Sequence, residues 1–171
     1  SGQSGNSLLK NGGFEKQTAD SQPDIYKADN WLKSSVEGSI SGRDTDPHNG
    51  SGHYNLYNKS TSGVQTIYQE ITLSGGKTYT ASAYVKTPQM TSVASDGGAF
   101  LQIANTNGTA LKKGNILSYK TAETIDNGWQ RITVTYTPSS SGTYRVCLVW
   151  NHAKGTLKAD DIQLEEGTAE G

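Results

Sequence analysis

Three carboxylates near the two ends of this 171-residue chain are the side chains best suited to metal chemistry. Glu15 follows a glycine pair close to the N-terminus, and Asp160 and Asp161 lie within the alternating apolar pattern of residues 156–164. If a first and a last strand lie side by side in one sandwich, these carboxylates supply the hard oxygen ligands that a calcium ion requires. The competing interpretation is that backbone amides or Lys10 satisfy Glu15 and Asp160 without a metal.

The alternation of residue types around Asp160 predicts that its side chain points inward. Residues two apart in a strand share a face, so Asp160 falls on the face of Ile162 and Leu164. An unpaired carboxylate on an apolar face is costly, and a bound cation offsets that cost. The pattern therefore favours Asp160 as a calcium ligand.

No combination of residues in the sequence predicts a catalytic centre. His48 and His53 lie in a glycine-rich loop without the spacing of a metalloprotease, and His152 follows a strand. No serine stands in the small-residue turn that hydrolases use for their nucleophile. The carboxylates named above could form a glycosidase pair, but beside a glycine turn they more often bind calcium or cap backbone amides. We therefore predict that the domain is not an enzyme.

A second group of residues has the chemistry to bind sugars. The chain has nine tyrosines and three tryptophans against two phenylalanines, a bias towards aromatic side chains with a polar group. Sugar faces rich in C–H bonds stack on aromatic rings, while amides and hydroxyls bind the sugar hydroxyls. We expect one concave sheet surface to carry the ligand-binding candidates, which are Tyr84, Tyr68, Lys86, Gln102, Trp150 and Asn151.

The orientation of Trp150 stays open at this point. Trp150 ends a strand at residues 143–150, and a period of two does not decide whether Trp150 or Asn151 faces the core. Trp31 and Trp129 are both expected in the core. If the sheet surface is not the site, the loops around Tyr26, His48 and Tyr57 are the alternative.

The elements that must position these residues are short strands joined by turns. A hydrophobic content of 32% and 20 glycines argue against a helical bundle. Alternate residues from Tyr79 to Val85 form the core face of the clearest strand, at 77–87. Asn107-Gly108 predicts a hairpin after a strand at 99–105, and residues 88–98 are typical of a loop. We predict an all-β, antiparallel β-sandwich (jelly roll) of about eight to ten strands, with the first and last strands adjacent.

Several motifs, in their order along the chain, carry a family resemblance. They are LLKNGGFE (8–15), Trp31, GSGHYNL (50–56), IYQEITL (67–73), GKTYTASAYVKT (76–87), NGWQRITVTYTP (127–138) and LKADDIQLEE (157–166). Over nearly its whole length the chain resembles the β-jelly-roll carbohydrate-binding modules of families four, nine and twenty-two, within the galactose-binding-like β-sandwich superfamily. The resemblance implies a sugar-binding domain with this fold.

The resemblance also implies a structural calcium ion between the first and last strands. In the resembling families its ligands are the glutamate after NGGF, the aspartate that opens the DD pair and nearby backbone carbonyls. Carried over to this sequence, the ligands are Glu15 and Asp160, with Gly13 as a main-chain ligand and Asp161 as a substitute.

Length and composition favour one domain, which we place at residues 7–166, with a linker or vector remnant at 1–6 and a linker at 167–171. A net charge of −1 without long charge runs argues against nucleic-acid partners. No apolar stretch is long enough to span a bilayer and no signal peptide is visible. The single cysteine, Cys147, excludes an internal disulfide, and its apolar neighbours predict a buried thiol.

The combined interpretation is a non-catalytic carbohydrate-binding module that targets a larger protein to a polysaccharide or glycan. We expect a monomer, without nucleic-acid partners or membrane insertion, that accompanies other domains of a parent chain, for example a glycoside hydrolase. The expected location is secreted or at the cell surface, in the bacterial extracellular space. The alternative is a structural or adhesive β-sandwich spacer that binds no sugar.

Overall fold

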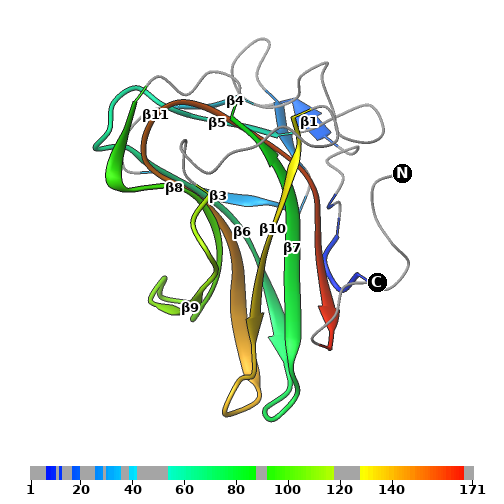
Figure 1. Ribbon diagram of the computed structural model, residues 1–171. Coiled ribbons are helices and arrows are strands. Elements are labelled where there is room, and N and C mark those ends of the chain that lie inside the picture. The colour runs from blue at the N-terminus through cyan, green and yellow to red at the C-terminus, as the bar shows by residue number, and fades with distance from the viewer. Residues whose placement is uncertain are drawn as a thin grey trace.

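The computed structural model describes residues 7–10, 12, 17–19, 26–28, 30–35, 39–41, 54–87, 92–117 and 128–167. All the regular elements in these ranges are strands, joined by turns, and the sheets are antiparallel throughout (Figure 1). No helix in the described ranges has the length and apolar character needed to cross a membrane. The prediction of an all-β antiparallel fold is confirmed.

Two sheets form the body of the molecule and share one strand. We call sheet I the strands in the order β3 (Leu32–Ser35), β6 (Val64–Leu73), β11 (Gly142–Glu166), β8 (Ser92–Ala104) and β9 (Ala110–Lys113). Sheet II has the order β10 (Gln130–Tyr136), β7 (Tyr79–Lys86), β11, β5 (Tyr54–Asn58) and β4 (Ser39–Ser41). A separate two-stranded ribbon joins β1 (Gln17–Ala19) and β2 (Tyr26–Ala28). With β11 counted once, the described residues contain eleven strands, slightly more than expected.

The long strand β11 passes from one sheet into the other. It pairs with β6 and β8 up to Lys154, and from Gly155 onward it pairs with β5 and β7. The bend between the two halves contains His152 and Gly155, whose φ angles are 48° and 121°. The sequence predicts two separate strands here, at 143–150 and 156–164. The structure instead keeps one strand that bends, and Figure 1 shows it curving over the top of the sandwich.

β8 begins at Ser92, although the sequence predicts a loop up to residue 98. The glycine at position 97 permits a close approach of two backbones. A Cβ atom at Gly97 would lie 2.3 Å from the carbonyl oxygen of His152. The hairpin predicted at Asn107-Gly108 is confirmed, since the Gly108 N–H donates to the Asn105 carbonyl at 3.0 Å between β8 and β9.

One apolar core lies between the two sheets. Sheet I contributes alternate residues such as Ile67, Leu101 and Leu148, and sheet II contributes the alternate residues from Tyr79 to Val85 that the sequence predicts. Trp31 also belongs to this core, as expected. Beyond the part of β11 that pairs with β5, the Leu8 N–H donates to the Leu164 carbonyl at 2.8 Å. The opening segment therefore lies beside the last strand, which confirms the predicted adjacency.

Candidate functional site

The outer surface of sheet I brings together two of the predicted ligand-binding residues. Tyr68 on β6 and Gln102 on β8 both lie opposite Cys147 of β11, one on each side. β3 and β9 extend the same row to Leu32 and Lys113. We call this surface the Tyr68 face, and it also includes the neighbouring rows with Glu70, Arg145, Thr66, Val149 and Phe100.

A small apolar cluster forms the base of the Tyr68 face. Phe100, Ala104, Cys147 and Val149 are buried there, and Tyr68 packs against them while staying partly exposed. The cluster is separate from the core between the sheets. Burial raises the pKa of the Cys147 thiol to about 11, although a hydrogen bond with Gln102 and the positive charge of Arg145 act in the opposite direction. The predicted buried thiol is confirmed. It is protonated and neutral beneath the Tyr68 face.

Two cations lie over the aromatic rings of the Tyr68 face. The guanidinium carbon of Arg145 lies 4.2 Å from the centre of the Tyr68 ring, and its Nε donates to Glu70 Oε2 at 3.1 Å. The ammonium group of Lys113 lies 5.3 Å from the centre of the Phe100 ring. Both contacts have cation–π geometry.

Sequence reasoning missed Arg145 and Lys113 as candidates for the binding surface. Strand alternation could have identified Arg145, because it lies on the same side of its strand as Cys147 and Asn151. Lys113 gave no comparable signal, because it lies on the short exposed strand β9 beyond the hairpin.

The outer surface of sheet II carries two further predicted residues, Tyr84 and Lys86. Tyr84 on β7 lies between Arg131 of β10 and Asp160 of β11. We call this surface the Tyr84 face, and it also includes Thr80, Ser82, Trp129, Thr133, Thr135 and Lys158. Tyr84 and Lys86 therefore lie in a different sheet from Tyr68 and Gln102, and the expectation of one shared surface is wrong.

The polar groups of the Tyr84 face are occupied by the protein's own contacts. Arg131 donates to the Ser82 hydroxyl at 3.1 Å, and the hydroxyls of Thr80 and Thr135 lie 3.0 Å apart. Tyr84, Lys86 and Arg131 each have further interactions within the protein. This face therefore presents few unused donors or acceptors to a ligand.

Trp129 is buried, as the sequence predicts, but it does not join the apolar cluster between the sheets. Its exposed fraction is 2%, and the ammonium group of Lys86 lies 5.7 Å from its ring centre. It stands outside both apolar clusters of the described residues and precedes Gln130, whose partner Val85 faces the core. The strand alternation therefore places Trp129 on the Tyr84 face.

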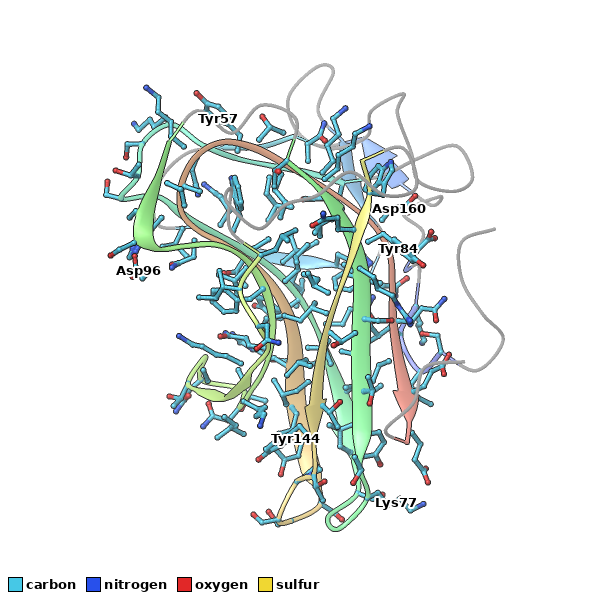
Figure 2. The ribbon with its side chains drawn as sticks, viewed as in Figure 1. Tyr57, Lys77, Tyr84, Asp96, Tyr144 and Asp160 are labelled. Carbon is cyan, nitrogen blue, oxygen red and sulfur yellow. The ribbon has the colours of Figure 1, made fainter. Side chains whose placement is uncertain are left out.

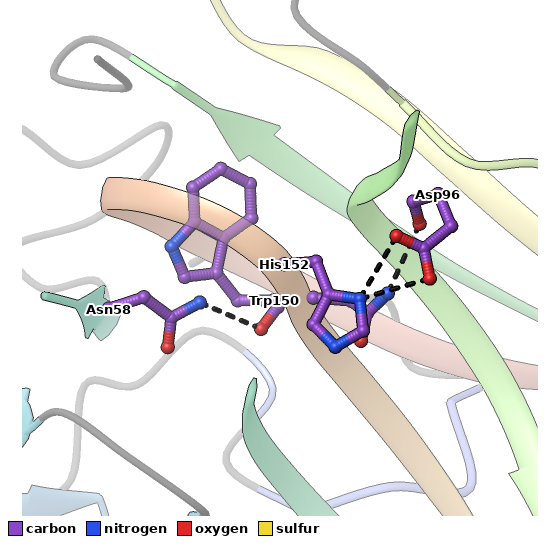
Figure 3. Close-up of polar contacts among 5 residues, drawn as sticks. Asn58, Asp96, Trp150 and His152 are labelled. Carbon is purple, nitrogen blue, oxygen red and sulfur yellow. Dashed lines mark hydrogen bonds and ion pairs between the residues drawn. The ribbon is translucent and has the colours of Figure 1, made fainter. Parts of the chain in front are cut away.

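Trp150 belongs to the core and has no surface for a sugar. Its exposed fraction is 0%, and its indole Nε1 donates to the Gly155 carbonyl at 3.0 Å. Asn58 Nδ2 donates to the Trp150 carbonyl at 3.1 Å (Figure 3). Of the two orientations that the sequence left open, the structure has Trp150 inside and Asn151 outside. Trp150 is therefore wrong as a ligand-binding candidate.

Asn151 lies at the end of the Tyr68 face, where β11 bends. Its Nδ2 donates to the Asp96 carbonyl at 3.1 Å, so its amide ties β11 to β8. Nearby, Nδ1 of His152 lies 2.9 Å and 3.0 Å from the two carboxylate oxygens of Asp96 (Figure 3). This contact lowers the pKa of Asp96, with the hydrogen bond to His152 as the largest cause.

The predicted metal ligands of the last strand lie at an irregularity in β11. Asp160 pairs with Tyr84, but the next pair joins Gln163 to Ser82, so β11 holds one extra residue here. Asp161 has a φ of 51°, and its N–H donates to Asp160 Oδ1 at 2.8 Å. Figure 2 shows Asp160 and Tyr84 near each other beside the upper part of β7.

Asp160 is buried, but the bulge places it on a different face of β11 from the one that the sequence predicts. Its exposed fraction is 0%, as predicted, but Ala159 before it and Ile162 after it both belong to the core. Asp160 is therefore on the outer side of sheet II with Tyr84, and the predicted shared face with Ile162 is wrong. Asp161 is also buried, so two carboxylates are withdrawn from water side by side.

These two carboxylates fit the chemistry of a hard cation. Charges buried this closely need compensation from cations or hydrogen-bond donors, and calcium binds carboxylate oxygens of this kind. The Ile162 N–H donates to the Gly12 carbonyl at 2.9 Å, so the N-terminal segment reaches the bulge. Gly13 and Glu15 lie outside the described residues. Among the residues that are described, no three His, Cys, Asp or Glu side chains converge on one point.

Comparisons with known proteins agree with this architecture. A structure of the module TmCBM61 in complex with β-1,4-galactotriose matches with a TM-score of 0.60 and 15% identity, over 94% of this chain and 99% of that one. A structure of a CBM4 module matches with a TM-score of 0.60 and 19% identity, over 92% and 98% of the two chains. The arabinose-bound α-L-arabinofuranosidase MgGH51 has a TM-score of 0.66 and 19% identity over 96% of this chain, which spans 27% of that enzyme.

The sequence comparisons identify the family. A search of curated proteins gives no match. The family model CBM_4_9, described as a carbohydrate binding domain, matches residues 6–151. This match covers most of the chain and agrees with the antiparallel β-sandwich and with the similar CBM61 and CBM4 modules. The chain therefore belongs to the CBM_4_9 family of carbohydrate-binding domains, which are non-catalytic sugar-binding modules.

Proposed function

We propose that the domain binds its glycan on the Tyr68 face. The observation that carries the proposal is the partly exposed Tyr68, which packs on a small apolar cluster and is bordered by the polar side chains of Gln102, Arg145 and Lys113. Such a surface matches a sugar ring, whose faces are apolar and whose edges carry hydroxyls. Because the polar groups of the Tyr84 face are already engaged, they are less suited to a ligand.

The similar structures support a saccharide ligand without identifying it. One of them holds β-1,4-galactotriose and another holds arabinose. Identities of 15% and 19% relate the folds and do not transfer the sugar. The ligand class we propose is therefore an oligosaccharide segment of a polysaccharide, lying across several strands of sheet I.

We extend the proposal to the setting of the domain. Carbohydrate-binding domains of this kind bind glycans and occur beside other domains such as glycoside hydrolases, typically in extracellular enzymes. The domain would then hold a secreted bacterial parent protein against its polysaccharide, and it would do so as a monomer. Size-exclusion chromatography with light scattering tests the monomer, and an apparent dimer mass at working concentration would contradict it.

We also propose a structural calcium ion at the bulge of β11. Asp160 and Asp161 would be ligands from the last strand, with Glu15 and the Gly13 carbonyl from the opening segment. Supporting observations are the burial of both aspartates and the hydrogen bond from Ile162 to Gly12. The ion would join the two ends of the domain and stabilise the fold, away from the Tyr68 face.

The experiment that tests the function is affinity electrophoresis on a panel of soluble polysaccharides, followed by calorimetry on the best ligand. We expect retention of the wild-type domain by at least one glycan and loss of that retention in Tyr68→Ala. Tyr68→Phe is the matched control, because it keeps the ring and removes only the hydroxyl. If no glycan in a broad panel retains the domain, the spacer alternative is favoured. If a glycan retains Tyr68→Ala fully, the site is not the Tyr68 face.

A further inference from the structure

The cations that cover the aromatic rings of the Tyr68 face indicate a particular class of glycan. A neutral sugar usually stacks directly on an aromatic ring, but here Arg145 already lies over Tyr68 at 4.2 Å and Lys113 over Phe100 at 5.3 Å. Phe100 is also almost completely buried, with 3% exposure. A ligand that approaches this face therefore meets cationic nitrogen atoms before it meets the rings.

These cations retain unused hydrogen-bond donors. Arg145 uses Nε for Glu70, and its two terminal nitrogens make no hydrogen bond to the described residues. Lys113 has its ring contact but no ion pair within the described part of the chain. A guanidinium with two free nitrogens is suited to a carboxylate or sulfate, which it can bind in a bidentate manner.

The spacing of these donors suits an extended chain of sugars. Tyr68, Arg145, Gln102 and Lys113 come from four neighbouring strands, β6, β11, β8 and β9. At about 4.8 Å per strand, three steps cover roughly 14 Å. Two acidic groups of the described residues border this surface. Glu70 is held against Arg145. Asp96, at the bend of β11, is held by His152, while the charge of Lys113 also contributes to the lowered pKa of Asp96.

Resting on the proposed function of the Tyr68 face, we propose that its preferred ligand is an anionic glycan. Arg145 binds a carboxylate or sulfate group of one sugar residue, and Lys113 binds a second such group further along the chain. Gln102, which lies between them, donates to a hydroxyl of the intervening residue. The proposal assigns the specificity to Arg145 and Lys113 and not to an open aromatic platform.

The test compares anionic glycans with neutral counterparts by calorimetry at two salt concentrations. The probes are polygalacturonate and its carboxyl-reduced form for the carboxylate, and carrageenan and agarose for the sulfate. We expect at least one anionic probe to bind about tenfold or more tightly than its neutral counterpart, as befits a charge-assisted hydrogen bond. A difference between polygalacturonate and its reduced form would show that a carboxylate is recognised, and a difference between carrageenan and agarose would show that a sulfate is. Added salt should weaken binding of the anionic probe more than binding of the neutral one.

Variants separate specific recognition from general charge attraction. Arg145→Gln and Lys113→Gln should each lower the affinity for the anionic probe by about tenfold. Lys77→Gln removes the same charge from the turn before β7, where Lys77 lies 3.6 Å from Glu166, and should leave affinity within about twofold. Figure 2 shows Lys77 at the opposite end of β7 from Tyr84. Lys113 is exposed on β9, so Lys113→Gln tests the proposal even if Arg145→Gln weakens folding.

Three results would overturn the proposal. Equal binding of neutral and anionic probes, with loss in Tyr68→Ala, would leave the Tyr68 face as the site and refute the anionic preference. An equal effect of Lys77→Gln and Lys113→Gln would show attraction to net charge only. Anionic binding that persists in Arg145→Gln, Lys113→Gln and Tyr68→Ala would refute both this proposal and the site.

Discussion

The two outer surfaces of the sandwich carry similar residues and differ in what those residues contact. Each has a partly exposed tyrosine in mid-strand and an arginine on a neighbouring strand. On the Tyr84 face, Arg131 binds Ser82, and Tyr84 and Lys86 have further contacts within the protein. On the Tyr68 face, Arg145 keeps its terminal nitrogens available above an apolar cluster. The comparison teaches that residue type and strand position do not define a binding surface until the protein's own contacts are known.

The largest effect that would sharpen this comparison is expected at Trp129. If the Tyr84 face is structural, Trp129→Ala removes a buried ring and should lower the free energy of unfolding by about 3–5 kcal/mol. Urea denaturation measures this, and glycan affinity of the folded protein should stay unchanged. The matched control is Leu32→Ala, at an exposed end of the Tyr68 face, with an expected change below about 0.5 kcal/mol. Intact stability with reduced affinity in Trp129→Ala would move the binding site to the Tyr84 face.

Removal of the proposed calcium ion from the bulge of β11 should lower the stability of the whole domain. A ligand present at about a hundredfold excess over its dissociation constant stabilises the native state by roughly 2.7 kcal/mol. For a domain of this size that corresponds to a change of about 5–10 °C in melting temperature. We expect EDTA to lower the melting temperature of calcium-loaded protein by this amount and calcium to restore it, with Asp160→Asn insensitive to both. An unchanged melting temperature in protein with verified bound calcium would exclude a stabilising site.

A pair of tyrosine variants tests the comparison at the level of binding. Tyr68→Ala should weaken glycan binding by about 1.5–3 kcal/mol, because the ring supports the Arg145 guanidinium that binds the charged group of the glycan. Tyr84→Ala should leave the affinity unchanged and reduce stability, because Tyr84 takes part in contacts of its own face. Calorimetry and thermal unfolding of both variants measure the two quantities. The reverse pattern would assign the glycan to the Tyr84 face.

The smallest effect concerns acid stability at the bend of β11. The hydrogen bond from His152 lowers the pKa of Asp96 in the folded protein. Its stabilising contribution is therefore present above the ordinary pKa of an aspartate and is lost as the pH falls through the lowered folded value. In Asp96→Asn the melting temperature should fall less steeply as the pH is lowered. The difference should be small, because the Asp96–His152 pair is exposed to solvent. A steeper acid dependence in the variant would contradict this assignment.

Much of the fold could be predicted from the sequence, because local signals and the architecture agree. Period-two alternation from Tyr79 to Val85 identifies a core face correctly, and Asn107-Gly108 identifies a hairpin. The errors occur where alternation breaks. One extra residue at Asp160-Asp161 reverses the parity of β11, and a bulge leaves no clear signal in a polar sequence.

The candidate site was less predictable than the fold. Strand parity gives the face of a residue within one strand, but it does not tell which strands share a sheet. Tyr68 and Tyr84 therefore appeared to be neighbours although they belong to different sheets. Trp150 illustrates the second limit, because its burial depends on the bend of β11 and the carbonyl of Gly155.

The sharing of β11 between both sheets has a consequence for how the chain acquires its structure. β5, β6, β7 and β8 all use this strand as a neighbour, although β11 is made after them. During synthesis neither sheet can be completed until residues 142–166 have emerged from the ribosome. Pairings between segments so distant in sequence form slowly, and the earlier strands keep unpaired edges in the meantime. The closing strand thus determines when the domain becomes resistant to aggregation and proteolysis.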